Sequence, residues 1–533
     1  MSGAWREWQR IRRYAVPQRM IDECAEARER GDWRAACAAG RVDVAIGDAV
    51  MAQVEDQLAG FAPDLLRWHL PREAGGFTTL ARRRRYLLIP DRPAGDDPTT
   101  LVVESPISRD GSQRLTLRAM DDADIDHQWS HPVPAYLWDA RHAAQFRAAV
   151  GGSADRLPWF TSAGDPLPPH SFGMGTDEPA RAERARSALG PAEALAVAGI
   201  SVSAEDTWRS SELYDDLTSI DLLRLRYEIR WLAARQRGTK WAVPFGYWCY
   251  LSVDADGEDV RVTMRGGLAN HPVDRALPRL SLSLARFSPD LDLVWHGLST
   301  PADLHPLVRL ALFPSAATAA PPAAATPASD RFRVRCRGVW HEIKMRDGRL
   351  DLPEHSEAEQ QRERTLRALG GTVTGCFAVE QTWTGARGRL PKKLHAHRDD
   401  LWQRITHGGT RVLWEMLDAG LNPHLRDGRG RTLIHRARSF DHARLLPRLL
   451  AAGVDVNAKD VEGSTALYLA VVHRWPADLI IALVDAGADL HTPNQYGETV
   501  LGRLEDHFQL AEDYEQEVEP DFQVAADYLR GRA

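Results

Sequence analysis

Carboxylates and imidazoles gather in one short stretch of the N-terminal half, between residues 121 and 131. They are Asp121, Asp122, Asp124, Asp126, His127, His131 and, further on, His142. Side chains of these two types together can hold a divalent metal ion or share proton transfer in catalysis. Pro132 and Pro134 disfavour a helix that would place the histidines on one face. The stretch is the best enzymatic candidate, and a solvated capping loop is the alternative.

A second candidate is the triplet Glu342-Ile343-Lys344, which lies on an expected strand with Asp330 upstream. Glu-x-Lys beside an acid resembles the core of a large nuclease superfamily, in which carboxylates hold a metal and the lysine steadies the attacking water. The surrounding segment is too small for that fold. The alternative is that the two charged residues are outward-facing neighbours on a hairpin.

Basic and aromatic residues suggest contacts with phosphates at two places in the N-terminal part. They are Arg82, Arg83, Arg84 and Arg85, with Trp5, Trp8 and Tyr14 near the N-terminus. The net charge of −7 argues against a general nucleic-acid binder, so we interpret the arginine run as a solvated face beside a strand. The motifs GxxxxGK(S/T), HExxH and GxSxG are missing, which leaves the catalytic residues, if there are any, unknown.

The cysteines bear on the cellular compartment. Cys24, Cys37, Cys249, Cys336 and Cys376 are odd in number and scattered, with no metal-ligand spacing, so we expect a reduced environment and neither a metal nor a cofactor. The N-terminus lacks an apolar signal core, and the longest apolar stretches are too short to span a bilayer. Arginine far outnumbers lysine and alanine is abundant, as in GC-rich bacterial genomes. These features predict a cytoplasmic bacterial protein.

At 533 residues the chain is too long for one core, so several domains are expected. Residues 314–329 read PSAATAAPPAAATPAS, which predicts a semi-rigid linker. Residues 1–313 alternate expected helices with hairpins, and this pattern favours an α+β class. The expected elements are a helical hairpin over 20–39, strands at 86–89, 101–104 and 114–117, an amphipathic helix over 220–236, and a hairpin of 247–253 with 260–264.

A small ββα module is expected over 330–394. Strand-like residues 332–336 precede two runs, 339–345 and 349–352, that flank an Asp347-Gly348 turn. Ser356 and Glu359 have the spacing of a capping box, and the helix they open should end at Gly370-Gly371. Such a unit would serve as an N-terminal buttress for the C-terminal segment.

In the remaining residues, 395–533, two short sequence motifs recur at the same spacing. GRTLIH begins at residue 430, GSTALY at 463 and GETVL at 497, while AGLN, AGVD and AGAD begin at 419, 452 and 486. The glycines that open the first motif are 33 and 34 residues apart. The repeat length and the two motifs resemble an ankyrin repeat array. Such an array is an all-α solenoid whose units must stack to bury their apolar faces.

The resemblance implies roles for several residues. Thr432 and Thr465 should cap first helices, and leucine-rich second helices should face the core and end at Gly453 and Gly487. Pro447 should bend its helix, and Pro476 should fall in a first turn. The first unit, from about Asp399, lacks the opening threonine, and Tyr468 replaces the family's histidine. An acidic stretch and a final helix over 522–529 should cap the array.

In the family, hairpin tips and inner helices form a concave surface that binds another protein. Carried over by phase, the partner-binding positions are Arg429, Arg431, Ser439, Phe440, Val461, Glu462, Ser464, His473, Gln495, Tyr496 and Glu498. Mixed charge with aromatic residues suits a protein-binding patch. Solvated tips are the alternative for each residue taken alone.

These features predict an interaction protein whose repeats recruit a protein partner, or are regulated by one, through the concave face. Contact with membranes or nucleic acid is not expected, and self-association is left open. The alternative is a hydrolase or nuclease of a bacterial conflict system, with its chemistry in residues 1–313 and its target selected by the repeats. In that case Asp124, Asp126, His127 and His131 should converge in one pocket.

Overall fold

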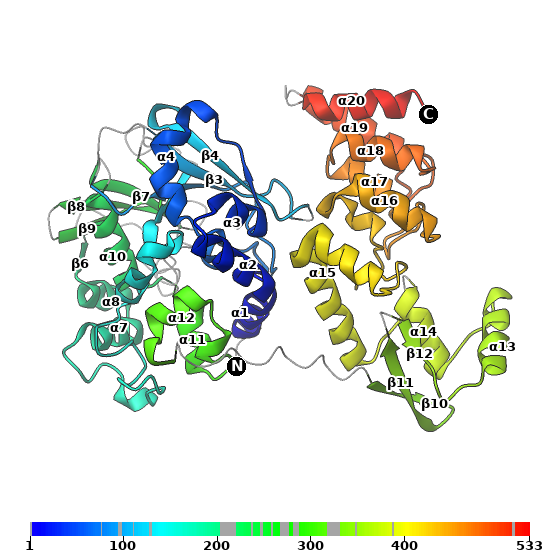
Figure 1. Ribbon diagram of the computed structural model, residues 1–533, viewed down its shortest axis with the longest axis horizontal. Coiled ribbons are helices and arrows are strands. Elements are labelled where there is room, and N and C mark those ends of the chain that lie inside the picture. The colour runs from blue at the N-terminus through cyan, green and yellow to red at the C-terminus, as the bar shows by residue number, and fades with distance from the viewer. Residues whose placement is uncertain are drawn as a thin grey trace. The chain divides into compact units, whose positions relative to one another are not determined.

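A computed structural model describes residues 3–532, apart from 76, 94–98, 110, 127–129, 203–219, 236–237, 246–248, 257–258, 267–276, 281–286, 317–330, 347–348, 386–387 and 514–517. The chain divides into two compact units (Figure 1). Unit 1 comprises Met1–Arg109 and Gln113–Pro322, and unit 2 comprises Ala323–Ala533 with the short piece Asp110–Ser112. The main boundary thus falls within the Pro/Ala tract at 314–329.

Unit 1 contains a five-stranded sheet of order β1-β4-β3-β2-β5. Its strands are β1 (Val42–Val44), β2 (Arg85–Ile89), β3 (Thr99–Glu104), β4 (Leu115–Asp121) and β5 (Ser130–Pro134). The three central strands are antiparallel, whereas β1 runs parallel to β4 and β5 parallel to β2. Successive residues of β2 and β3 are buried, so this sheet is covered on both faces rather than on one.

A second, four-stranded sheet of unit 1 has the order β6-β9-β8-β7. Its strands are β6 (Ile200–Val202), β7 (Lys240–Phe245), β8 (Cys249–Asp256) and β9 (Asp259–Gly266). The hairpin predicted over 247–264 is β8 with β9, whose register pairs Val253 with Val262. The five-stranded sheet has two antiparallel and two parallel pairs, and the four-stranded sheet has two antiparallel pairs and one parallel pair, so unit 1 is a mixed helix and sheet structure.

Helices surround the two sheets, and α4 packs on β3 (Figure 1). The helices are α1 (Gly3–Tyr14), α2 (Gln18–Glu29), α3 (Trp33–Ala39), α4 (Asp48–Gly60), α5 (Pro63–His69), α6 (Phe146–Ala149), α7 (Glu178–Ser187), α8 (Pro191–Ala198), α10 (Leu222–Ala233), α11 (Pro289–Trp295) and α12 (Pro306–Leu312). The expected helical hairpin is α2 with α3, where the Asp32 side chain accepts from the Ala35 N–H at 2.9 Å. No described helix combines the length and apolar composition that crossing a bilayer requires.

The amphipathic helix expected over 220–236 is α10, and two of its charged residues are buried as well. Leu222, Leu223, Ile229 and Leu232 lie in the core. The buried Arg224 donates to Glu228 at 2.9 Å, and Glu228 also accepts from the Tyr136 hydroxyl at 3.1 Å. Because these charged groups pair with each other, their hydrogen bonds are satisfied inside the fold. A helix with polar residues on one face can therefore be buried on that face as well.

Two buried aspartates join the N-terminal helices of unit 1 to residues near position 300. Asp290 accepts from the Arg12 guanidinium at 2.6 Å and from the Trp68 indole at 3.2 Å. Asp64 accepts from Arg28 at 2.5 Å and lies 3.0 Å from Nε2 of His305. Because Nδ1 of His305 accepts from the Leu307 N–H, Nε2 carries the proton and donates to Asp64.

In unit 2, three antiparallel strands open the structure: β10 (Arg331–Cys336), β11 (Val339–Arg346) and β12 (Arg349–Asp351). Helix α13 (Glu357–Ala368) begins at the predicted capping box, since Ser356 and Glu359 exchange hydrogen bonds. Helix α14 (Gly375–Thr384) was not expected from the sequence. The next segment, α15 (Lys392–Asp418), consists of two helices joined at Gly409, whose φ is 71°, and its first helix crosses the expected boundary at 394. One core extends from Phe332 to Leu529.

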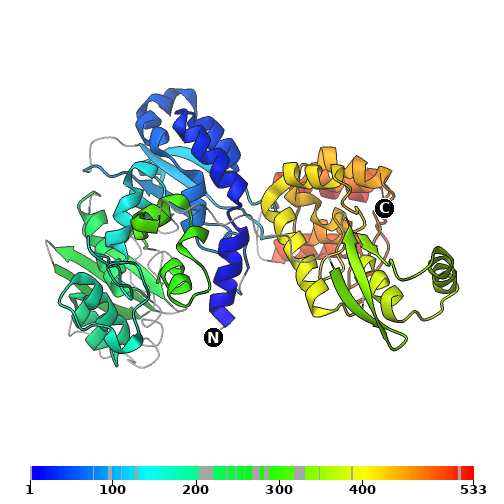
Figure 2. The same cartoon turned by 60° about the horizontal axis from the view of Figure 1, so that its bottom comes forward.

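The repeats form two layers of helices (Figure 2). One layer holds the 3-10 turn η8 (Ile434–Ser439), α17 (Ala466–Val472) and α19 (Val500–Asp513), and the other holds α16 (His442–Ala451), α18 (Ala477–Asp485) and α20 (Pro520–Arg530). Gly453 follows α16 and Gly487 follows α18, with φ of 78° and 90°, as predicted. Helix α16 continues through Pro447, and Pro476 directly precedes α18 rather than lying in its first turn.

Each loop between repeats is fixed by one Asp or Asn side chain. Oδ1 of Asp427 accepts from the N–H groups of Arg429 and Arg431 at 2.8 and 2.9 Å. Asp460 and Asn494 accept from the residues two and four positions later in the same way, at 2.8–3.0 Å. Two otherwise unpaired backbone donors are satisfied in every loop, and this interaction sets the shape of the hairpin tips.

Replacing Asp64 with asparagine should destabilise unit 1 by about 3 kcal/mol, because it leaves the Arg28 charge without its counter-ion inside the fold. Urea unfolding of the full chain, with hydrogen exchange of peptides from α5 and α12 to identify unit 1, measures the change. Asp56→Asn is the control, because the Asp56 side chain is 80% exposed in its pair with Arg141. Equal stabilities of the two variants would contradict a structural role for Asp64.

Replacing Asp460 with alanine should lower the stability of the array by about 2 kcal/mol or more, since two N–H groups and Arg431 lose their acceptor. Glu462→Ala lies in the same loop with an exposed side chain and should change stability by less than about 0.5 kcal/mol. Circular dichroism during urea unfolding compares them. A neutral Asp460→Ala would show that the loop does not depend on its side chain.

Candidate functional site

The hairpin tips of the array form one connected row. The Val461 N–H donates to the carbonyl of Arg429 at 2.9 Å, and the Gln495 N–H donates to the carbonyl of Glu462 at 3.0 Å. Gly430, Gly463 and Gly497 close the three loops with φ of 73°, 77° and 81°. Backbone bonds between loops keep the side chains at the tips in equivalent positions, one repeat apart.

The structure separates the predicted partner-binding residues into two groups. Six are exposed: Arg429, Glu462, His473, Gln495, Tyr496 and Glu498. Ser439 and Val461 are half-buried. The Tyr496 ring is the large apolar group of the row, with 70% of its surface open to solvent. The remaining three, Arg431, Phe440 and Ser464, are buried and therefore cannot contribute side chains to an open face.

The three buried positions connect one repeat to the next. Nε of Arg431 donates to Asp460 at 3.3 Å, and the carbonyl of Ser464 is 3.2 Å from Nε2 of His435. Phe440 belongs to the hydrophobic core of unit 2. Phase along the repeat identifies the surface of the hairpin, but it does not distinguish a side chain that points outward from one that reaches the neighbouring loop.

His435 occupies the position of the family's histidine and joins two repeats. Its Nδ1 accepts from the Thr432 N–H at 3.1 Å, so the proton lies on Nε2 and is donated to Ser464. Burial lowers the pKa of His435 to about 4, which keeps the ring neutral at physiological pH. Thr432 therefore contacts the His435 ring, whereas Thr465 caps α17 by accepting from the Tyr468 N–H at 3.2 Å.

Tyr468 replaces that histidine in the next repeat and makes an equivalent connection. Its hydroxyl donates to Glu498 at 2.5 Å, and Glu498 also accepts from the Asn494 amide at 2.8 Å. These two hydrogen bonds lower the pKa of the Glu498 carboxyl. The tips thus carry a cation at Arg429, carboxylates at Glu462 and Glu498, and an aromatic ring at Tyr496, of which Glu498 is already engaged in holding its loop.

In the part of the chain that the structure describes, the acidic and histidine-rich stretch of unit 1 divides between exposed and buried positions. Asp124 and Asp126 are exposed, and His131 is buried in β5 opposite Tyr86. Burial lowers the pKa of His131 to about 4. His127 lies outside the described residues. His142 is elsewhere, with Nδ1 3.1 Å from Asp91.

The Glu-x-Lys triplet and the basic run also have structural explanations. Ile343 on β11 points into the core, so Glu342 and Lys344 lie on the opposite face of the sheet, where Glu342 is 3.6 Å from Arg331. Asp330 lies outside the described residues. Arg82, Arg83 and Arg84 are exposed before β2, and Arg85 pairs with Glu104 at 3.3 Å. Both observations agree with the simpler interpretation given to each.

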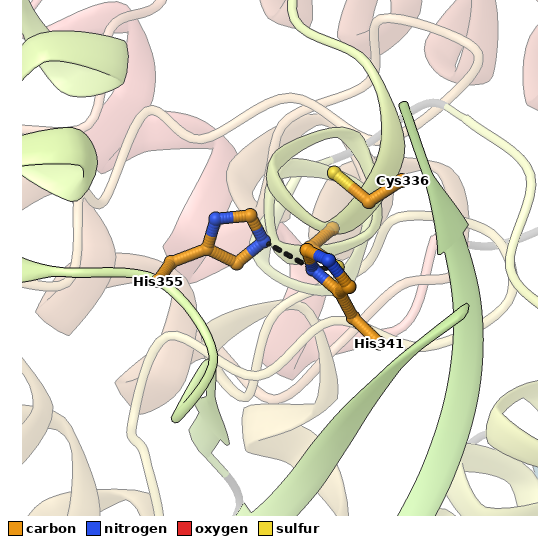
Figure 3. Close-up of side chains that lie close together, drawn as sticks. Cys336, His341 and His355 are labelled. Carbon is orange, nitrogen blue, oxygen red and sulfur yellow. Dashed lines mark hydrogen bonds between the residues drawn. The ribbon is translucent and has the colours of Figure 1, made fainter. Parts of the chain in front are cut away.

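A cluster of two cysteines and two histidines in unit 2 was not predicted from the sequence. Ligand atoms of Cys336, His341, His355 and Cys376 all lie within 4.8 Å of one another. Figure 3 shows three of them, with the imidazoles of His341 and His355 joined by a hydrogen bond of 2.9 Å. Burial, with Cys336 alongside, raises the pKa of the Cys376 thiol. The cysteines are scattered when taken alone, and the signal that could have found the cluster is a histidine on the strand next to Cys336.

Comparisons with known proteins concern the repeats. A family model for ankyrin repeats (many copies) matches residues 416–470. An ankyrin repeat-containing protein of Schizosaccharomyces pombe, P1E11.10, is 36% identical over 81 residues, which are 15% of this chain and 39% of that protein.

Two channel proteins match over somewhat shorter lengths. The human transient receptor potential cation channel subfamily A member 1 is 34% identical over 76 residues, 14% of this chain and 7% of the channel. The potassium channel AKT2/3 of Arabidopsis thaliana is 33% identical over 70 residues, 13% of this chain and 9% of the channel. The chain spans less than half the length of each of these relatives. The C-terminal part of the chain is an ankyrin repeat domain. The repeated sequence motifs, the hydrogen bonds within the loops and the similar proteins all support this assignment.

Proposed function

We propose that the ankyrin repeat domain binds a protein partner through the row of hairpin tips. The observation that carries this proposal is the rigid, connected row itself. Three equivalent loops are each fixed by an Asp or Asn and present Arg429, Glu462 and Tyr496 to solvent. A preformed row loses little conformational entropy when a partner binds, so even a modest set of contacts yields affinity.

The chemistry of the row favours a partner surface of mixed charge with an apolar recess. Arg429 and Tyr496 are of the two residue types most often found among energetically important interface contacts, together with tryptophan. Glu462 between them selects against an acidic surface, and this also separates the row from a phosphate-binding face. Gln495 offers an amide that can donate and accept, which suits hydrogen bonds to an exposed backbone.

We also propose a division of labour along the chain. The repeats would select the partner, and residues 1–313 would either act on the recruited protein or be controlled by it. The Pro/Ala tract at 314–329 has the composition of a spacer, and a spacer lets two units work on one partner. The module over 330–394 would support the N-terminal end of the array, with which it shares a core.

A triple variant of exposed tip residues tests the proposal: Arg429→Glu, Glu462→Arg and Tyr496→Ala. The matched control changes exposed residues of the other helix layer: Arg444→Glu, Asp478→Arg and Val524→Ala. We expect a protein captured from a lysate of the source organism by the wild type and by the control. The tip variant should retain it at least about tenfold less, since one hot-spot residue alone accounts for more than about 1–2 kcal/mol.

Far-UV circular dichroism and the unfolding midpoint of both variants should match the wild type, because none of the six changed side chains is buried. The proposal would be wrong if the tip variant, still folded, retained the same proteins as the wild type and the control. If only the control variant lost the partner, the binding surface would lie on the layer formed by α16, α18 and α20.

A further inference from the structure

The Cys/His cluster of unit 2 has the donor set and the spacing of a tetrahedral metal centre. Sγ of Cys376 is 3.7 Å from Nδ1 of His341. The same nitrogen is 2.9 Å from Nε2 of His355 (Figure 3). Around a zinc ion with usual bond lengths, neighbouring ligand atoms are about 3.3–3.8 Å apart. The four atoms, all within 4.8 Å of one another, therefore need to move by only a few tenths of an ångström to about one ångström to enclose an ion.

Four different elements bring these side chains together. Residues of β10 alternate between exposed and buried, so Cys336 faces inward with Phe332 and Val334. His341 lies on the same face of β11 as the buried Ile343, diagonally across the hairpin from Cys336. His355 follows β12, and Cys376 is in the first turn of α14. The alternation of both strands thus directs one cysteine and one histidine to the same place.

Gly375 permits the closest of these approaches. Its φ is +61°, and a Cβ at this position would come within 2.5 Å of Sγ and 2.9 Å of Cα of Cys336. Only glycine lets the start of α14 lie against the end of β10, and this contact places the two sulfur atoms side by side.

The surroundings of the cluster are those of a closed site. Cys336 and Cys376 are buried, the His355 side chain is 7% exposed, and the Phe377 ring is 4.6 Å from the His355 ring. The second ring nitrogen of His355 faces the Glu359 carboxylate at 3.8 Å, in the position of a partner that orients a ligating histidine. Glu359 is itself held by the Ser356 N–H at 3.1 Å.

We propose that Cys336, His341, His355 and Cys376 bind one structural Zn²⁺ ion. Two thiolates and two imidazoles in a tetrahedral arrangement select zinc over magnesium or calcium, which prefer oxygen ligands and higher coordination numbers. Four protein ligands leave no open position for water or substrate, so the ion holds the fold and does not catalyse a reaction. Binding releases the thiol protons to solvent and leaves every oxidation state unchanged.

The ion would connect the β10–β11 hairpin, the loop after β12 and α14 at one point. The module is small, and small domains commonly depend on a metal for stability. Since the module shares its core with the repeats, the metal would also stabilise the N-terminal end of the array. A short array needs covered ends, so zinc would support the partner-binding row at a distance.

Metal analysis of the reduced full-length chain is the direct test. After expression with zinc and dialysis, mass spectrometry should find one zinc ion per wild-type chain. Cys376→Ser should lower the zinc affinity by more than about 100-fold, since loss of an outer-shell partner alone costs about 10–100-fold. Cys24→Ser is the matched control, because Cys24 is an equally buried cysteine of unit 1, and it should keep the zinc.

Cobalt substitution keeps the test decisive if a variant fails to fold. In the wild type, Co²⁺ should give the intense visible bands of a tetrahedral site and the near-ultraviolet charge-transfer band of thiolate ligands. His341→Ala should shift or abolish the visible bands. A reduced wild-type chain that takes up neither zinc nor cobalt would overturn the proposal, and so would a Cys336–Cys376 disulfide in the freshly purified protein.

Discussion

Unit 2 depends on one constraint: no ankyrin unit can cover its own apolar face, so each must be covered by a neighbour. Leu445 and Leu449 of α16, and Leu479 and Leu483 of α18, belong to a single core that continues into α20 and back to β10. The two ends of the array are therefore as important as its middle. At one end α20 buries Phe522 and Leu529, and at the other the small module continues the same core.

The same constraint explains how side chains at the loops divide their roles. Asp427, Asp460 and Asn494 use their oxygens on backbone donors inside each loop, and Arg431 and His435 reach from one loop to the next. Only side chains that do not take part in these contacts within and between loops are available to bind a partner. The proposed binding row is small because most of the polar groups near it already stabilise the stack.

Unit 1 has an apolar core of its own, and buried ion pairs cross it. Its buried carboxylates join segments that are far apart in sequence: Arg12 and Asp290 are 278 positions apart, and Asp64 and His305 are 241 positions apart. Such pairs add little net stability over apolar contacts of the same volume, but removing one partner is costly. They fix which segments meet, and the C-terminal residues of unit 1 are thereby required to complete the packing of its first helices.

The sequence by itself determined the features that rest on local contacts. The left-handed glycines, the Ser356–Glu359 capping box and the β8–β9 hairpin all depend on residues a few positions apart, and each was predicted. The repeat length was likewise evident from the sequence motifs themselves. Helix α14 and the start of α15 were missed, because neither has a distinct cap or a clear apolar period.

Only the tertiary structure decided which residues meet across the fold. It buried Arg431, Phe440 and Ser464, which repeat phase had placed on the binding surface, and it buried His131 while leaving Asp124 and Asp126 exposed. It also brought Cys376 beside His341, 35 positions away. The spacing of residues along the chain indicates on which face of a strand or helix a side chain lies. Which side chains lie opposite that face depends on how the elements pack together, and local sequence patterns do not contain this information.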